Sequence, residues 1–457
     1  MSEREYSRRR FLKNSTLTGL GVGLTAAYTP NVFAGHVKDA GTAAILGGQP
    51  LRSKEWPDWP MWDPKTDEEQ VIKVLRSGIW SRAKVVAEFE DKWAITIGTK
   101  RCLATTSGTQ ALITALRQLD VGAGDEVLVT PYTFIATIDA ILMCGAMPVF
   151  VDTNPATSQI DADKIEEKIT SRTTTILPVH ILGLPADMVK IMSIAKKNNL
   201  TVLEDACQAW LAEIDNRKVG SWGDAGCFSF QNSKHIPIGE GGAIVSDNDE
   251  FMDRCFSFHN FGRPHGKVVG TVAGEYVMLG SKCRTTEYQA AIGLAQLKRL
   301  EEQTKIREEN AKYLRARIND IPGILPYELS ENATRAVFHI FPFRYKKEKF
   351  HNLPRQEFLK ALNAEGIPCS GGYSPLNNMP YLKDAFQTKN FQKVYPKEML
   401  DFNGFVERNH CPKTDQLCKE AVWFRQSMLL GSKSDMNDIA MAIEKIHNNA
   451  EKIAKDV

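Results

Sequence analysis

The sequence has almost no net charge, since 57 lysines and arginines against 55 aspartates and glutamates leave a formal charge of +2. A chain without a basic or acidic excess has no field that would favour nucleic acid or an anionic membrane, so small-molecule chemistry is the better starting hypothesis. The nine cysteines are an odd number and include no CxxC pair. The sequence therefore predicts free thiols rather than a disulfide framework, and no metal centre.

The first 34 residues differ from the rest of the chain. Residues 7–13 read SRRRFLK, a modestly apolar run with several glycines follows, and Val32-Phe33-Ala34 is typical of a small-residue cleavage site. This layout predicts a twin-arginine export signal over residues 1–34, with a basic unstructured tail as the alternative. The apolar run is too short and glycine-rich for a stable membrane span. If the signal acts, the folded protein is exported to a periplasmic or other extracytoplasmic space.

Between Arg101 and about Val245, short β-branched runs alternate with amphipathic, helix-like stretches. Such alternation predicts an α/β fold with a mainly parallel sheet covered on both faces. Ligands of such sheets bind beyond the carboxyl ends of the strands. The strand candidates are residues 126–131, 147–152, 175–180, 201–205 and 242–247.

A long charged helix, predicted from Thr286 to Asn319, leads away from this unit into a smaller C-terminal α/β domain. The pattern there predicts a strand near 336–346, a helix near 355–366 and a final helix capped by Ser434 or Asp435. The predicted organisation is a signal (1–34), an N-terminal arm (35–80), a large ligand-binding domain (81–305) and a small domain (306–457).

Three stretches carry side chains suited to chemistry. One strand ends on Asp205, a carboxylate at the expected ligand edge, although turns and helix caps also use aspartate. Ser107-Gly108-Thr109 lies between a strand and a helix, where free N–H groups make either a phosphate site or a simple cap. Lys234 lies between the apolar residues 226–230 and a glycine-rich turn. Such surroundings lower the pKa of a lysine and make its amine nucleophilic, whereas most lysines are solvated.

A phosphate cradle, an acid at a strand end and a partly buried lysine are the parts that hold pyridoxal phosphate. The motifs SGTQAL, GDEVLVTPYTFIAT, GAMPVFVD, VHILG, EDACQA, FSFQNSK and GEGG together resemble the DegT/StrS-type sugar aminotransferases. The resemblance runs from Leu46 to Gly431. It implies the pyridoxal phosphate transferase fold type I, with a mainly parallel seven-stranded sheet in the large domain, and a homodimer whose subunits share both sites.

The same resemblance implies a role for each matching residue around the cofactor ring. Lys234 would bind the cofactor covalently and later move a proton between substrate and cofactor. Asp205 would pair with the protonated pyridine nitrogen, and Gln208 would contact the 3-oxygen of the ring. Phe134 would stack on the ring face.

The resemblance also implies how the cofactor phosphate is held. Gly108 and Thr109 would bind it through the helix start, helped by the hydroxyl of Ser229. His180 would help to shape the site, or it would be an ordinary buried histidine of the core.

Several positions depart from the family pattern. Lys282 stands where many relatives have an asparagine that reaches the cofactor phosphate of the neighbouring subunit, so Lys282 would contact that phosphate as a point charge or alter the choice of substrate. Trp210 and Leu211 replace smaller or polar groups and would narrow the pocket. Phe261 replaces a histidine.

The resemblance implies transfer of an amino group from glutamate or glutamine to a keto sugar or cyclitol. A sugar dehydratase is an alternative, since some relatives have histidine in place of the lysine, but here His235 is only adjacent to it. A third possible function is a scaffold or binding protein without turnover, because export would remove the chain from nucleotide-sugar pools.

Residues 55–62, EWPDWPMW, are rich in tryptophan and proline. They would form an arm that packs on the main domain or on the partner subunit, or a proline-stiffened linker.

Overall fold

A computed structural model describes residues 41–266 and 275–456 of the chain. The predicted export signal at residues 1–34 lies outside these ranges. Among the helices of the described ranges, none is both long enough and apolar enough to cross a membrane. No group of three or more histidine, cysteine, aspartate or glutamate side chains there could hold a metal ion. The nine cysteines are free thiols.

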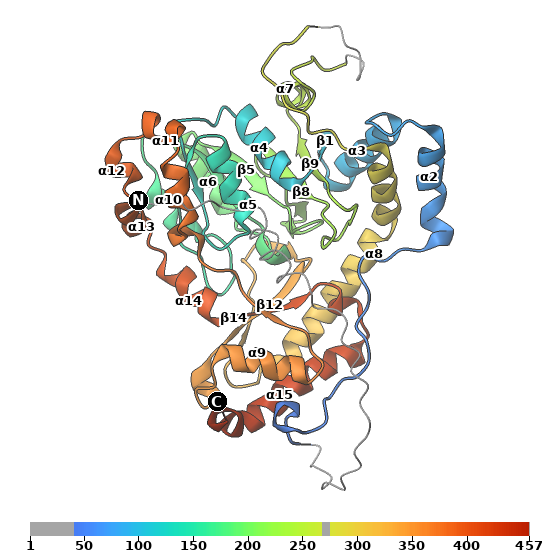
Figure 1. Ribbon diagram of the computed structural model, residues 1–457, viewed down its shortest axis with the longest axis vertical. Helices are drawn as coiled ribbons and strands as arrows, with labels where there is room; N and C mark the ends of the chain where they lie inside the picture. Colours follow the sequence, from blue (N-terminus) through green and yellow to red (C-terminus); the bar gives the residue numbers. More distant parts are fainter. Residues whose placement is uncertain (1–40, 267–274, 457) are drawn as a thin grey trace, which may run out of the picture. The chain divides into compact units, whose positions relative to one another are not determined.

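The central sheet has seven strands in the order β1-β9-β8-β5-β4-β2-β3 (Figure 1). All five strand candidates are confirmed, and so is the mainly parallel seven-stranded sheet. Strand β9 alone runs antiparallel to its neighbours β1 and β8, because the loop between β8 and β9 contains no crossover helix. The strands are β1 Arg101–Thr105, β2 Glu126–Val129, β3 Met147–Phe150, β4 Thr173–Leu177, β5 Thr201–Asp205, β8 Ala225–Ser229 and β9 Gly242–Ser246.

Helices cover both faces of this sheet. Along β2, Val127 and Val129 join one buried apolar cluster, while Leu128 between them joins the other, as the two-residue period of a strand requires. Helices α4 (Gly108–Gln118), α5 (Ile135–Met143) and α7 (Asp249–His259) contribute to the first cluster. Helices α3 (Lys84–Ile97) and α6 (Met188–Asn198) contribute to the second.

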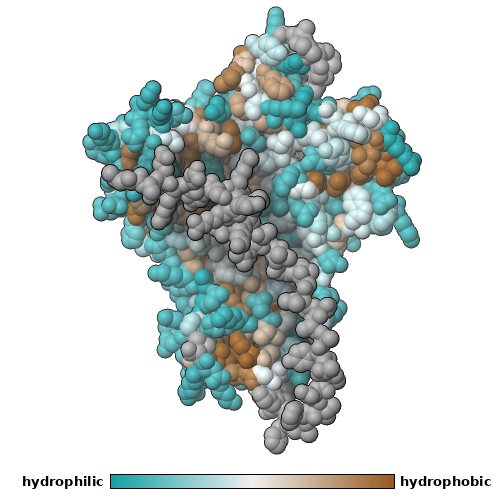
Figure 2. All heavy atoms as spheres, viewed as in Figure 1, coloured by the Kyte–Doolittle hydropathy of each residue, from teal (hydrophilic) through white to brown (hydrophobic). Residues whose placement is uncertain are grey.

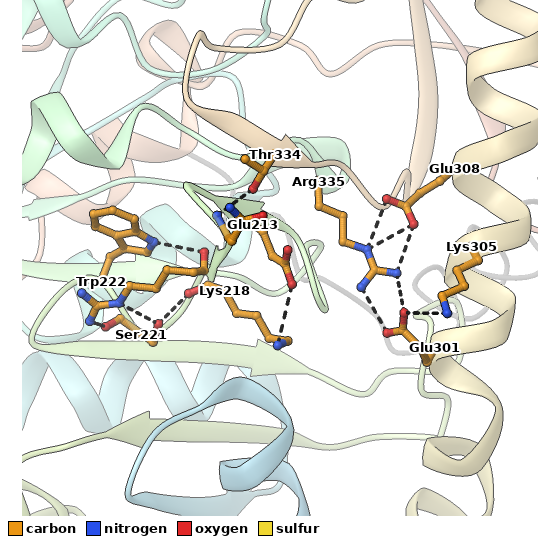
Figure 3. A network of polar contacts seen from close by, with 11 residues as sticks. Glu213, Lys218, Ser221, Trp222, Glu301, Lys305, Glu308, Thr334 and Arg335 are labelled. Carbon is orange, nitrogen blue, oxygen red and sulfur yellow. Dashed lines mark hydrogen bonds and ion pairs between the residues drawn. The ribbon is translucent and has the colours of Figure 1, made fainter.

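The predicted long helix is α8, Glu287–Ile318, capped by Thr286 with Gln289 completing a capping box. It extends from α2 (Pro64–Ser77) and α3 to the C-terminal part of the chain (Figure 1). Arg335 ties this helix to a small sheet of β11 (Ala333–Arg335), β6 (Glu213–Ile214) and β7 (Arg217–Lys218). Figure 3 shows its guanidinium between Glu301 and Glu308 of α8, with nitrogen to oxygen distances of 3.0 Å to each.

The C-terminal part contains an antiparallel sheet in the order β10-β12-β14-β13. The predicted strand and helix are confirmed as β12 and α9, and the predicted domain boundary at 305/306 falls inside α8. The segment between β13 and β14 returns to the large sheet, where Asn409 accepts from the Phe150 N–H at 2.7 Å. The elements are β10 Ile324–Pro326, β12 Ile340–Tyr345, β13 Ser370–Gly371, β14 Ala421–Arg425, α9 Arg355–Ala364, α10 Tyr381–Phe386, α11 Lys389–Val394, α12 Lys397–Leu400, α13 Phe402–Arg408, α14 Pro412–Glu420 and α15 Lys433–Lys455.

The final helix α15 begins earlier than predicted, because its cap is Ser432 and neither Ser434 nor Asp435. Asp435 instead closes a capping box by accepting from the Ser432 N–H at 2.6 Å. Its other oxygen accepts from Arg52 Nη1, also at 2.6 Å, which joins the N-terminal segment to α15. Burial alone would raise the pKa of Asp435, but the bonds from Arg52 and Ser432 outweigh burial and hold that pKa well below its usual range.

We expect Asp435→Ala to lower the free energy of unfolding by roughly 2–4 kcal/mol, because it breaks the capping box of α15 and removes one partner of a buried ion pair. The charged carboxylate stabilises the fold above its ordinary pKa of about 4, and this contribution is lost as the pH falls toward the lower pKa of the folded state. Denaturant unfolding should therefore show the difference at pH 7 and a shrinking difference below about pH 4. Asp456→Ala, at the exposed end of α15, is the control. Equal losses in both variants would contradict the prediction.

Candidate active site

A cavity of about 600 Å³ opens beyond the carboxyl ends of β5 and β8. Residues of the α4 start, the α5 start and the loop after β8 form its wall, together with side chains from the C-terminal part. Seven of the eight predicted site residues line this one cavity, namely Gly108, Thr109, Phe134, Asp205, Gln208, Ser229 and Lys234. Lys282 is the exception, since it is exposed and does not line the cavity of its own chain.

The start of α4 approaches the strand ends closely. Ser107 caps the helix by accepting from the Gln110 N–H at 3.1 Å. A Cβ on Gly108 would lie 2.8 Å from the Cys207 sulfur and 2.9 Å from the Ser229 Cβ, so only glycine fits there without displacement. The first N–H groups of a helix have no partner inside it and carry a partial positive charge. The arrangement can hold an anion beside Thr109 and Ser229.

Asp205 is held as a carboxylate acceptor at the cavity wall. Its Oδ2 accepts from the Thr137 hydroxyl at 2.8 Å, and its Oδ1 accepts from the Cys207 N–H at 3.1 Å. Thr137 in turn lies 2.9 Å from the Thr133 hydroxyl. With both oxygens fixed and the residue 4% exposed, the carboxylate can pair with a cationic ring nitrogen in the cavity.

Gln208 and Tyr373 join the two sides of the cavity. The Gln208 Oε1 accepts from the Leu182 N–H at 2.9 Å, and its Nε2 donates to the Tyr373 hydroxyl oxygen at 2.9 Å. Burial raises the pKa of Tyr373 to about 12, so the hydroxyl keeps its own proton to donate into the cavity. This contact fixes a residue of the C-terminal part beside Asp205.

Lys234 lies in the turn after β8, and its Nζ is 3.4 Å from His339 Nε2. The ring centre of Trp210 is 5.9 Å from the same nitrogen. Burial lowers the pKa of Lys234 below its ordinary value, although the negative charge of Asp205 opposes this shift. The amine therefore loses its proton more readily than a solvated lysine and is a better nucleophile.

His180 is a buried structural residue rather than part of the cavity wall. Its Nδ1 accepts from the Ala186 N–H at 3.0 Å, so its Nε2 carries the proton and donates to Glu204 at 3.0 Å. Glu204 also accepts from three backbone N–H groups between residues 220 and 223. The alternative of an ordinary core histidine is therefore the correct interpretation.

Trp210, Leu211 and Phe261, three residues that depart from the family pattern, are not among the lining residues of the cavity. Trp210 is fully buried and donates from Nε1 to the Ser229 carbonyl at 3.1 Å, so it supports the end of β8 from behind. Leu211 is also buried. Neither is a lining residue, although Trp210 packs against His339, which is one. The narrowing of the pocket by Trp210 and Leu211 stays a prediction. Phe261, by contrast with these two buried residues, is 45% exposed at the surface of the chain.

Among the residues of the wall that were not predicted from the sequence, Thr137, His339 and Tyr373 contact predicted site residues through their side chains. His339 gave the clearest signal, as a single polar residue in the apolar run AVFHIFPF. Thr137 belongs to the quoted PYTFIAT motif but follows Phe134 by nearly one helical turn, which places it at the cavity. Tyr373 follows two glycines in an irregular segment and gave no periodic signal.

The sheet topology and the buried lysine at its edge fit a pyridoxal phosphate-dependent enzyme of fold type I, and comparison with known proteins identifies an aminotransferase. The DegT/DnrJ/EryC1/StrS aminotransferase family model matches residues 63–400, and the chain belongs to this family. L-glutamine:2-deoxy-scyllo-inosose aminotransferase of Streptoalloteichus tenebrarius is 32% identical over 418 residues, covering 88% of this chain and 97% of that protein.

Two solved structures are similar over most of the chain. 3-Amino-5-hydroxybenzoic acid synthase is 30% identical with a TM-score of 0.74, covering 88% of this chain and 100% of that one. The aminotransferase from Psychrobacter cryohalolentis is 29% identical with a TM-score of 0.75, covering 87% and 100%. Family membership implies pyridoxal phosphate, and the glycine cradle at α4, the fixed carboxylate and the buried amine fit that group.

We expect Thr137→Val to reduce kcat/KM about ten- to a hundredfold, because a hydrogen bond to a charged carboxylate is worth roughly 1.5–3 kcal/mol. Steady-state kinetics and the dissociation constant of pyridoxal phosphate would measure the effect. The control is Thr114→Val on α4, a buried threonine whose hydroxyl has no partner among the described residues. Similar kinetics for the Thr137 variant and the wild type would show that this hydroxyl does not support Asp205.

Proposed function

We propose that this chain transfers an amino group from glutamine or glutamate to the ketone of a cyclitol or keto sugar, with pyridoxal phosphate held in the Lys234 cavity. One observation carries the proposal: the buried amine of Lys234 shares a cavity with the fixed carboxylate of Asp205 and the start of α4. The relative named for glutamine and 2-deoxy-scyllo-inosose supports glutamine as donor and an inosose as acceptor.

Pyridoxal phosphate, when bound, supplies an electron sink that lets a C–H bond beside the amino nitrogen ionise. The residues of this chain would do the rest. The start of α4 and the Ser229 hydroxyl would bind the phosphate, and Asp205 would hold the proton on the ring nitrogen. Phe134, 57% exposed at the start of α5, would cover the ring face. The Lys234 amine would move the proton at the reacting carbon.

The two alternatives have less support. A dehydratase that uses histidine in place of the lysine would need His235 in the cavity, but His235 is 1% exposed and does not line it. A scaffold without turnover does not fit a chain that belongs to an aminotransferase family and keeps a lysine of lowered pKa at the expected place.

We also propose that the protein is exported and that it acts on a free sugar or cyclitol rather than on a nucleotide sugar. Residues 7–13 support export through the twin-arginine route. An exported enzyme would meet few nucleotide sugars, so a free inosose or 3-keto sugar is the proposed acceptor.

We also propose a homodimer with shared sites. Large apolar side chains are exposed around α2 and the residues after it, namely Ile72, Leu75, Ile79 and Trp80. Figure 2 shows brown, hydrophobic residues on the side of the molecule where Figure 1 labels α2. A further exposed set comprises Tyr276, Val277 and Leu279, close in sequence to Lys282. Apolar surface of this kind is typical of a subunit interface.

We expect Lys234→Ala to abolish amino transfer from glutamine to scyllo-inosose, because no other amine would replace the nucleophile. Mass spectrometry of the aminocyclitol product would measure turnover, and a panel with 3-keto sugars and nucleotide-linked 4-keto sugars would define the acceptor. Lys196→Ala, an exposed lysine of α6, is the control and should behave as wild type. Turnover near wild type in Lys234→Ala would refute the proposed function.

A mixing experiment tests whether Lys282 acts across the dimer. If Lys282→Ala alone is impaired, subunits carrying Lys234→Ala mixed with subunits carrying Lys282→Ala should recover up to about a quarter of wild-type activity, since half the dimers are hybrids with one complete site. The measurement is activity after unfolding and refolding the mixture, with each variant refolded alone as control. No recovery would place Lys282 in the site of its own chain or outside the chemistry.

A further inference from the structure

The indole of Trp59 contacts the backbone of the candidate catalytic lysine. Its Nε1 donates to the Lys234 carbonyl oxygen at 3.2 Å, across 175 residues of sequence. Trp59 belongs to the EWPDWPMW segment, residues 55–62. This segment therefore contacts the main fold directly behind the cavity, and it is more than a linker.

The segment that carries Trp59 is fixed to α8. The Met61 carbonyl accepts from Gln296 Nε2 at 2.9 Å and from Arg299 Nη1 at 3.2 Å. The guanidinium of Arg307, which is fully buried, lies 5.2 Å from the centre of the Trp59 ring. A cation beside the indole and two hydrogen bonds on a neighbouring carbonyl hold the ring in one orientation.

The backbone of Lys234 is held from two sides. Its N–H donates to the Gln231 carbonyl at 2.8 Å, and its carbonyl accepts from Trp59. A lysine side chain has many rotamers, so the position of its amine depends on a fixed backbone and on its neighbours. Without the indole donor, the turn at 231–234 would lose the bond that holds it from behind.

We infer that Trp59 is a positioning residue for the amine of Lys234: it fixes the carbonyl of this lysine to α8 and thereby keeps the amine against His339 in the cavity. This inference rests on the proposed role of Lys234 as the reactive amine.

Titratable groups from several elements face the Lys234 amine. They are Asp205 at the end of β5, Cys207 just after it, and His339 before β12. The neighbouring His235 is also within electrostatic reach of the amine, Tyr373 and Glu240 line the same cavity, and Arg307 lies beside Trp59. A substitution at position 59 alters none of them. A changed titration of the amine would therefore report a changed position of the lysine.

Trp56 is a matched control three residues earlier. Its Nε1 donates to the Gly366 carbonyl at 3.0 Å, and Arg52 lies 3.8 Å from its ring centre. Trp56 therefore makes the same two kinds of contact as Trp59, an indole bond to a loop carbonyl and an arginine beside the ring, but away from the cavity.

The test compares Trp59→Phe with Trp56→Phe in the full-length protein. The first readout is pulsed acetylation of Lys234 in cofactor-free protein over a range of pH, followed by mass spectrometry. We expect its midpoint to move toward that of a solvated lysine in Trp59→Phe only. The second readout is kinetic: kcat should fall about three- to tenfold, as loss of one neutral hydrogen bond predicts, with KM for glutamine little changed.

A second variant at position 59 separates the loss of the hydrogen bond from any change in packing or folding. Incorporation of 3-benzothienylalanine at position 59 keeps the shape of the ring and removes only the N–H donor, so it should reproduce both effects. Identical midpoints and kcat values in the Trp59 and Trp56 variants would overturn the inference. If the wild type itself transfers no amino group, the proposed function fails, but the acetylation midpoint still decides whether Trp59 positions the amine.

Discussion

The buried amine of Lys234, at the carboxyl edge of the large sheet, constrains the rest of this structure. An ammonium loses hydration when it enters a protein, so its neutral form is favoured and the surroundings must accept a hydrogen bond rather than supply a second charge. The loop between β8 and β9 meets this requirement. It places Lys234 beside His339, with the ring of Trp210 behind. The same loop has no crossover helix, so β9 returns antiparallel to β8.

The elements that local sequence dictates were predictable. Five strands follow from short β-branched runs, and α8 follows from a long charged pattern whose start at Thr286 carries its own capping box. The start of α15 was misplaced by two or three residues, because Ser432, Ser434 and Asp435 are all good caps by residue type. Ser432 is the cap because Asp435, three residues later, completes a capping box with it. The sequence did not reveal the additional bond from Arg52, which is 383 residues away from Asp435.

In the site, too, the residues fixed by local sequence were predicted, and the residues brought in by long-range contacts were not. Asp205 and Ser229 end strands, and Gly108 and Thr109 begin a helix, so topology alone brings these four to one edge of the sheet. Two residues that contact the other predicted site residues come from the C-terminal part of the chain. The Tyr373 hydroxyl reaches Gln208 across 165 residues, and His339 reaches Lys234 across 105. No short-range pattern contains such contacts, because they depend on how the C-terminal part packs against the large sheet.

Charge explains why a histidine can serve as the neighbour of the lysine. Burial lowers the pKa of His339 well below its usual value, and the positive charges of Lys234 and Arg307 lower it further. The ring is therefore neutral over the working range of an enzyme, so a hydrogen bond between His339 and the amine brings no second positive charge into the cavity. A lysine or arginine at position 339 would add that charge. The fold thus places Arg307 behind the indole of Trp59, with the neutral imidazole of His339 at the Lys234 amine itself.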